Sequence, residues 1–279
     1  MALSNITLGQ YYPADSAVHR MDPRVKIVLL IALIVAIFLA NNLLAFVPVV
    51  IFLVAATKLA KVPLKLMVKG LKPLRFILIL TFLLNLFFLP GETELLNLGF
   101  AGIKRESLLT AVHYSLRLMF LVLGSSLLTL TTPPIVLTDG LERLLSPLRV
   151  FHFPAHEMAM MMSIALRFIP TLLEEADKIM KAQTARGADF ESGNLIARAK
   201  AMVPLLVPLF VSAFRRAGDL AMAMEARCYH GGEGRTRLRV LKCEKRDYIA
   251  CAVMAVLIAA VVLCNRILYY DGGGGGRSG

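Results

Sequence analysis

Residues 27–57 read IVLLIALIVAIFLANNLLAFVPVVIFLVAAT, an apolar run that is interrupted only by Asn41-Asn42 at its centre and by its terminal threonine. A helix through all 31 residues would overshoot a bilayer, because about 20 apolar residues cross the hydrocarbon core. The run therefore predicts two short spans, 27–40 and 43–57, that turn at the asparagine pair. One long helix is the alternative.

Three more apolar runs, 74–89, 108–130 and 249–268, extend this pattern. Hydrophobic residues make up 57% of the chain and its mean hydropathy is +0.69, which is well above the composition of a soluble domain. The fold class expected is an all-α membrane protein with about five transmembrane helices. The expected domains are the first four spans within 1–130, a cytoplasmic domain of long amphipathic helices at 131–248, the last span at 249–268, and a Gly-rich tail at 269–279 that looks like a linker or a cloning scar.

The basic residues indicate the orientation of these spans. The net charge is +12, and segment 58–75 contains six Lys and Arg residues without a single acid. Because cytoplasmic loops are enriched in Lys and Arg, we expect the N-terminus, segment 58–75 and residues 131–248 in the cytoplasm. Topology and anionic lipid explain this charge better than a nucleic-acid partner does. The expected location is the bacterial plasma membrane, which the chain crosses several times.

Two long helical patterns, 155–186 and 194–227, end in the same way. The first closes with Ala182-Gln183-Thr184-Ala185-Arg186-Gly187, and the second closes with Ala223-Met224-Glu225-Ala226-Arg227-Cys228. Each is an Ala-x-x-Ala-Arg frame followed by a small residue. The repetition suggests contact with something that is itself duplicated.

Each repeated arginine has two interpretations. A cation in the last turn of a helix interacts favourably with the helix dipole, by about 0.3–1 kcal/mol. In the other interpretation, small neighbours let a partner approach while the guanidinium holds a carboxylate with two hydrogen bonds. The duplication favours docking over capping. The candidate docking residues are Ala185, Arg186, Gly187, Ala226, Arg227 and Cys228.

Further candidates lie in the fourth span and at the start of the first long pattern. His113 and Arg117 share one helical face, and ionisable residues in a span often contact a protein interior or a partner. An arginine that snorkels to the outer surface is the alternative. Met158, Met161 and Met162 suit a partner surface that must repack, although ordinary helix packing is the commoner explanation for any single methionine.

Catalytic motifs are missing from the sequence. It contains no Gly-x-x-x-x-Gly-Lys-Ser/Thr loop, so the chain is not expected to hydrolyse ATP itself. His152 and His156 have metal-pair spacing, but Phe153-Pro154 interrupts the helix between them. We therefore expect no catalytic residue, no metal and no cofactor. A self-sufficient permease or channel is the alternative function, although a permease usually shows two similar halves with broken spans.

Several short motifs extend along about 260 residues and together resemble one family. They are Gln10–Ser16 (QYYPADS), His19–Lys26 (HRMDPRVK), Leu130–Pro134 (LTTPP), Arg167–Pro170 (RFIP), Ala182–Gly187 and Ala223–Gly232. The chain resembles the transmembrane T component of an energy-coupling factor (ECF) transporter, in the group with the cobalt- and biotin-type T subunits.

The resemblance implies a role and a set of partners. Such subunits join two cytoplasmic ABC ATPase subunits to a membrane-embedded S component, often one of several interchangeable ones, that captures a vitamin or another micronutrient. Carried onto this sequence, Arg186 and Arg227 end the coupling helices and dock onto the two ATPases. His113, Arg117 and the methionines become possible contacts with the S component or within the membrane. Cys228 departs from the family pattern, which most often has Gly there, so a tight left-handed turn is less certain at that end.

Overall fold

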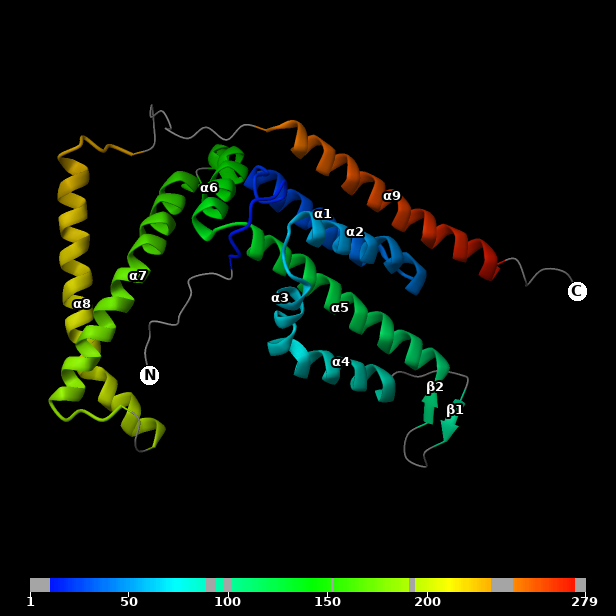
Figure 1. The fold of residues 1–279 in the computed structure, drawn as a ribbon, viewed down its shortest axis with the longest axis horizontal. Coiled ribbons are helices and arrows are strands. Elements are labelled where there is room, and N and C mark those ends of the chain that lie inside the picture. Colours follow the sequence, from blue (N-terminus) through cyan, green and yellow to red (C-terminus); the bar gives the residue numbers. More distant parts are fainter. Residues whose placement is uncertain are drawn as a thin grey trace, which may run out of the picture. The chain divides into compact units, whose positions relative to one another are not determined.

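The computed structural model describes residues 11–88, 94–97, 102–151, 153–190, 194–231 and 243–273. The described chain is helical apart from one short hairpin, and this confirms the all-α fold class (Figure 1). It divides into two compact units, one of residues 11–140 and 241–279 and the other of residues 1–10 and 141–240. His152, motif residues Gln10 and Gly232, and most of the C-terminal tail lie outside the described residues.

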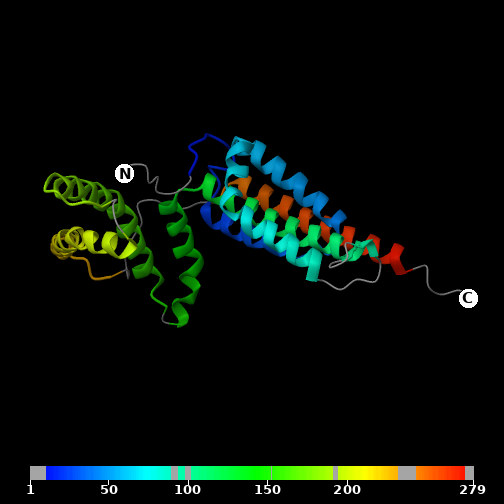
Figure 2. The same ribbon diagram turned by 90° about the horizontal axis from the view of Figure 1, so that it is seen from below.

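The first unit contains the apolar helices, which we call the helical bundle. In Figures 1 and 2 α1, α2, α4, α5 and α9 lie side by side, with α1 packed on α5 and α9, and α4 packed on α5. Its elements are α1 (Pro23–Leu39), η2 (Leu43–Ala45), α2 (Phe46–Leu59), α3 (Leu64–Lys69), η3 (Lys72–Leu74), α4 (Arg75–Phe88), β1 (Glu94–Asn97), β2 (Gly102–Lys104), α5 (Arg105–Thr131) and α9 (Lys245–Gly273).

The start of α1 is held to the start of α9 by two carboxylates. Asp22 caps α1 by accepting a hydrogen bond from the Arg24 backbone N–H at 2.9 Å, and Pro23 supplies a first-turn residue with a preset φ. The buried Asp247 accepts the Asp22 N–H at 3.1 Å and the Glu244 N–H at 2.8 Å. One side chain therefore satisfies backbone donors from both regions.

The asparagine pair separates α1 from α2. The backbone is extended at Ala40 and at Asn42, and η2 then leads into α2. Asn265 of α9 holds this turn, because its amide oxygen accepts the Asn41 N–H at 3.2 Å while its NH₂ group donates to the Leu39 carbonyl. The extended residues exclude one continuous helix over 27–57 in this structure.

The core of the bundle is a small cluster of tightly packed apolar side chains. Ile37, Val49 and Val261 are fully buried in it, and Phe46 stacks on Phe120 with ring centroids 5.3 Å apart. Most other apolar side chains point outward; several are more than half exposed. Examples are Ile51, Phe76 and Val256. An apolar exterior of this extent is what a helix surrounded by lipid requires.

Three described stretches are long and apolar enough to cross a membrane, namely Leu64–Phe87, Glu106–Thr131 and Lys245–Arg266. The first of them joins α3, η3 and α4. The second contains the expected span 108–130, and the third covers residues 249–266 of the expected span 249–268. The α1 and α2 helices have only 17 and 14 residues, and such helices extend about 26 and 21 Å. Five spans therefore remain a prediction.

A hairpin interrupts the helices between α4 and α5. β1 and β2 pair antiparallel, with Glu94 opposite Lys104 and Asn97 opposite Gly102. Strands of four and three residues are too short to show an alternating pattern, so the sequence did not indicate this hairpin.

The second unit, which we call the long-helix unit, contains η4 (Ser146–Phe151), α7 (Ala155–Ala185) and α8 (Leu195–Glu225). Helix α6 (Pro134–Leu145) crosses the boundary between the two units. It begins directly after α5, which ends at Thr131 before Pro133-Pro134 because a proline pair cannot continue a helix.

Candidate docking site at the ends of two long helices

The long-helix unit is held together by packing between α7 and α8. Glu175 of α7 accepts a hydrogen bond from Arg216 of α8 at 3.0 Å. The two helices also line a cavity of about 260 Å³, where Phe168 and Leu172 of α7 lie opposite Leu220 and other residues of α8. Residues near the middle of α7 thus lie against residues near the end of α8. The two helices run antiparallel and end at opposite ends of the unit (Figure 1).

The Glu175 carboxylate is stabilised by several neighbours. A hydrogen bond from Ser212 lowers the pKa of Glu175 most, and the hydrogen bond and charge of Arg216 lower it further. Both partners of the Arg216–Glu175 pair are partly exposed. Partly exposed ion pairs contribute little to stability, so the pair mainly fixes the register of α8 against α7.

The end of α7 has a defined backbone geometry. Gly187 adopts a left-handed φ of +92°. The Gly187 N–H donates to Thr184 O at 2.9 Å, and the Ala188 N–H donates to Gln183 O at 3.0 Å. These two bonds form a Schellman motif, which satisfies carbonyls that a helix end otherwise leaves unpaired.

The end of α8 repeats this geometry. Cys228 adopts a left-handed φ of +54°, the Cys228 N–H donates to Glu225 O at 2.9 Å, and the Tyr229 N–H donates to Met224 O at 3.1 Å. The left-handed turn that Cys228 left in doubt is therefore present. The cost is steric, since a non-glycine residue in this conformation is disfavoured by roughly 1–2 kcal/mol.

The candidate docking residues are all exposed. Arg186 and Arg227 each immediately precede the left-handed residue of their helix. Neither arginine side chain makes an ion pair or a hydrogen bond with the residues that the structure describes. A free guanidinium between small exposed neighbours, Ala185 and Ala226 on the preceding side, is open to an incoming carboxylate.

The methionines of α7 face outward within the long-helix unit. Met158, Met161 and Met162 are 48%, 59% and 52% exposed, whereas Ala155 and Ala159 are buried. Packing within this chain therefore does not account for these methionines. Flexible apolar side chains on an open helix face are suited to a partner that changes its contacts.

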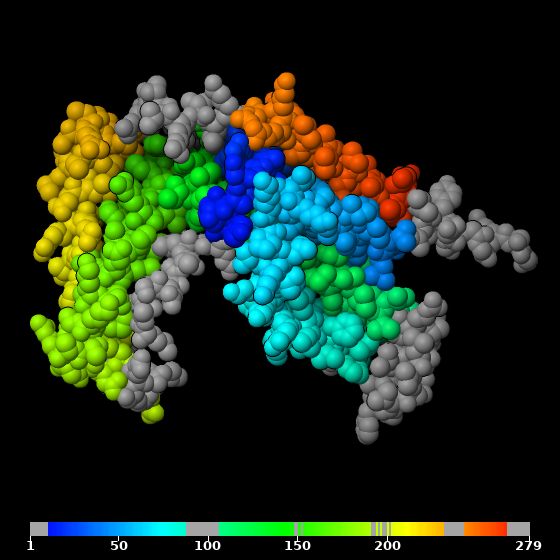
Figure 3. All heavy atoms as spheres, viewed as in Figure 1, coloured from blue at the N-terminus to red at the C-terminus, as the bar shows by residue number. Residues whose placement is uncertain are grey.

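Helix α8 presents an apolar face that the candidate residues did not include. Val203, Leu206, Val207, Phe210 and Phe214 are each more than half exposed, and α8 lies openly on the surface seen in Figure 3. Their helical spacing is the signal that could have identified them. Pro204 and Pro208 stand within the same helix.

His113 and Arg117 lie in the helical bundle, where they complete the end of α1. The Arg117 guanidinium donates to the Ala40 carbonyl at 2.8 Å and contacts His113 Nε2 at 3.0 Å, and it also lies 5.5 Å from the centroid of the Phe38 ring. The His113 ring stacks at 4.8 Å on Phe46. These contacts give both residues a structural role inside the chain, and no contact to a membrane partner is needed to explain them.

His156 pairs with an acid near the start of α7. Its Nδ1 lies 2.8 Å from Glu142 Oε1, while His152 lies outside the described residues. Within the described ranges, no group of three or more His, Cys, Asp or Glu side chains could hold a metal ion.

Comparison with known proteins places these features in context. Residues 14–238 match the family model CbiQ, described as cobalt transport protein. Two relatives named energy-coupling factor transporter transmembrane protein EcfT are very similar: that of Clostridium kluyveri is 52% identical over 266 residues (95% of this chain, 98% of its own), and that of Acidaminococcus fermentans is 54% identical over 255 residues (91% and 95%). The protein of the same name from Bacillus subtilis is 48% identical over 267 residues, which are 96% and 98% of the two chains.

Proposed function

Because the chain belongs to the CbiQ family of cobalt transport proteins, we propose that it is the energy-coupling transmembrane subunit of an ECF transporter. In this role it transmits the movements of two cytoplasmic ABC ATPase subunits to a membrane-embedded S component, which takes up a vitamin or another micronutrient. The names of its relatives at about 50% identity support this assignment. The chain itself is not an enzyme in this proposal, because the ATPases are separate subunits.

One observation carries the ATPase contact: two helix ends with the same backbone geometry each present an exposed arginine whose side chain has no partner among the described residues. Two copies of the same exposed arginine motif are suited to contacts with two ATPase subunits. An acidic groove on each ATPase would hold Arg186 or Arg227 by paired hydrogen bonds. The Schellman turn sets the direction in which the chain leaves the helix, so both arginines are presented in the same local frame.

The antiparallel packing of α7 and α8 supports the proposed transmission of movement. The ends of the two helices lie at opposite ends of the unit, so two ATPases that approach one another would shift α7 and α8 relative to each other. The exposed apolar faces of both helices would follow that shift. An S component seated on these faces would be reoriented and would release its substrate into the cell.

The topology belongs to the same proposal. Residues 1–130 hold four spans, residues 131–248 form the cytoplasmic coupling domain, and residues 249–268 cross the plasma membrane last. The N-terminus is then cytoplasmic. The segment 58–75, with its six basic residues and no acid, supports this orientation.

Charge reversal at both arginines tests the ATPase contact. In the Arg186→Glu, Arg227→Glu double variant we expect loss of co-purification with the ATPases, or ATP hydrolysis that no longer drives uptake. Arg215→Glu is the matched control, because it reverses an exposed charge of α8 away from both motifs. Normal assembly and uptake in the double variant would exclude the docking role. Transport by this chain alone in liposomes would instead support a self-sufficient permease.

A further inference from the structure

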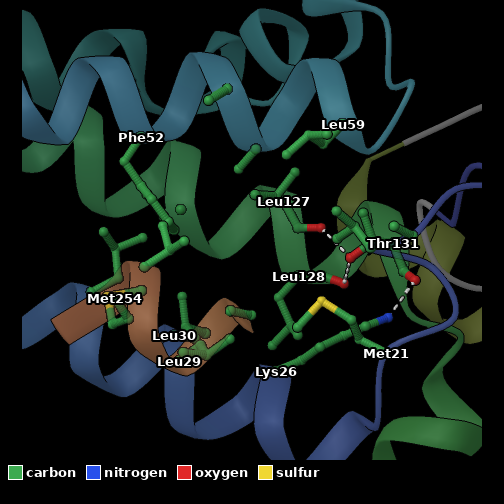
Figure 4. A pocket seen from close by; sticks show the side chains of 18 of the residues that line it. Met21, Lys26, Leu29, Leu30, Phe52, Leu59, Leu127, Leu128, Thr131 and Met254 are labelled. Carbon is green, nitrogen blue, oxygen red and sulfur yellow. Dashed lines mark hydrogen bonds between the residues drawn. The ribbon is translucent and has the colours of Figure 1, made fainter. Parts of the chain in front are cut away.

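A cavity of about 340 Å³ lies among α1, α2, α5 and α9 of the helical bundle, and the proposed coupling role does not use it. Its volume falls within the range of small-molecule sites, about 300–1,000 Å³. Figure 4 shows the cavity with Phe52 and Met254 at one end and with Met21 and Lys26 at the other. The cavity is elongated along the helices.

The cavity wall is almost wholly apolar. The α1 residues that line the cavity run from Lys26 to Leu33 along one side of the helix. This segment rises by about 10 Å. Small residues line the cavity on two helices. Gly124 lets α5 pack closely on α1, since a Cβ there would lie 2.8 Å from Leu33 Cδ2, and Ala250 of α9 has only a methyl group to place against the cavity. A narrow apolar channel of this length is suited to an alkyl chain.

The ammonium group at the polar end is already bound by the protein. Lys26 Nζ donates to His19 O at 3.2 Å, to Thr131 O at 3.1 Å and to Thr132 Oγ1 at 3.0 Å. These three bonds use all three of its donors, so Lys26 closes the cavity without offering a site to an anion.

Arg246 is the cation that remains accessible at this end. It lines the cavity, its side chain is 43% exposed, and its Nε lies 3.4 Å from Glu244. Arg20 and Lys61 lie nearby, since their charges and that of Arg246 all act on the exposed Asp15 carboxylate. Three cations and two acids, Asp15 and Glu244, leave this rim with a net positive charge.

We propose that the cavity holds one acyl chain of an anionic phospholipid, with the lipid phosphate bound at the Arg246 guanidinium. The apolar channel supplies the affinity for the chain, and the net positive rim selects an anionic headgroup over a zwitterionic one. Lys61 belongs to segment 58–75, which carries six basic residues and no acid, and its charge acts on this rim. The tail lies among helices from both ends of the sequence, so the lipid joins them.

Native mass spectrometry of the purified full-length chain tests this site. The chain is titrated with phosphatidylglycerol and with phosphatidylcholine of equal acyl composition, and the binding of the first lipid is measured. We expect tighter binding of phosphatidylglycerol. Arg246→Gln should weaken it about fivefold, as expected for one basic residue at a membrane surface, and should weaken binding of the zwitterionic phosphatidylcholine by a smaller factor. Arg215→Gln, an exposed arginine of α8 in the long-helix unit that does not line the cavity, is the charge control.

Filling the cavity tests the acyl chain separately. Ala250→Phe should weaken binding of both lipids at least tenfold, whereas Val256→Phe, on the outward face of the same helix, should not. Ala56→Leu on α2 replaces the first variant if Ala250→Phe does not fold. Unchanged lipid binding in the filled variant, equal affinity for the two lipids, or displacement of phosphatidylglycerol by glycerol 3-phosphate alone would each overturn the proposal.

Discussion

Cys228 occupies, at the end of α8, the backbone position that Gly187 occupies at the end of α7. Both residues have a left-handed φ, and in both cases the next backbone N–H bonds the carbonyl five residues earlier. Arg186 and Arg227 therefore precede turns of the same backbone geometry. Only the turn after α7 has a glycine, which adopts the left-handed conformation without strain.

Exchanging these two residues should change stability in opposite directions. Cys228→Gly relieves the steric cost of the left-handed conformation, and the greater flexibility of glycine in the unfolded chain offsets part of the gain. We expect a net stabilisation of about 0.5–1 kcal/mol. Gly187→Ala imposes that strain and should destabilise the protein by about 1–2 kcal/mol. Thermal unfolding in detergent measures both changes, and a lower melting temperature for Cys228→Gly would contradict the equivalence.

The turn between α1 and α2 depends on side chains from two distant helices. Arg117→Met and Asn265→Leu should each destabilise the protein by about 1–3 kcal/mol, because each leaves a helix-end carbonyl without its donor. The two changes act on adjacent carbonyls, so their effects should not add. The exposed neighbour Arg266→Met is the control. Equal stability of all three variants would show that the turn is held by other contacts.

The stability of the protein should depend on pH because of Lys26, which lies just before the expected span 27–40. Burial lowers the pKa of the Lys26 ammonium from 10.5 to about 8. Between pH 8 and 10.5 the unfolded chain binds more protons at this site than the folded chain, so stability should rise with pH. The pKa shift corresponds to at most about 3 kcal/mol of folding free energy. The three hydrogen bonds that the ammonium donates favour its charged form and therefore oppose the shift. A Lys26→Met variant should lack this rise when unfolding is compared at pH 7.5 and pH 10.

Two glycines should respond oppositely to alanine. A Cβ at Gly140 would lie 2.9 Å from Pro23 Cβ and 3.2 Å from the Pro23 carbonyl carbon, so α6 could not approach the start of α1 as closely. Gly140→Ala should destabilise the protein by about 1–3 kcal/mol. Gly218 of α8 has open space around it, and Gly218→Ala should stabilise the helix by up to about 1 kcal/mol. A stabilised Gly140→Ala variant would contradict this close approach.

Features that depend on local sequence were predictable. The asparagine pair indicated the separation of α1 from α2, and the repeated Ala-x-x-Ala-Arg frames indicated where α7 and α8 end. Both depend on residues adjacent in the chain, where backbone preference and helix capping act. The repetition also indicated that the two helix ends are alike, because a repeated motif is visible in the sequence without knowledge of the packing.

Features that depend on distant contacts were not predictable. Asn265 follows Asn41 by more than 200 residues, and nothing in its local pattern shows that its amide completes that turn. Lys26 reads as one more basic residue beside a span, yet its ammonium donates to the Thr131 carbonyl at the end of α5 and to the Thr132 hydroxyl, more than 100 residues away. Arg117 was correctly identified as an unusual charge in a span, but only the position of Ala40 shows what it binds within the chain.

The short apolar helical stretch Leu43–Leu59, which joins η2 and α2, also affects the lipid around it. It extends about 26 Å, which is less than the hydrocarbon core of about 30 Å, so a bilayer beside it must thin slightly or draw in polar flanks such as Lys58. Hydrophobic mismatch of this kind costs fractions of a kcal/mol per Å. A neighbouring membrane protein on this side of the chain would therefore cross a thinner layer. If the chain has the proposed coupling role, this thinning favours tilting of the neighbour.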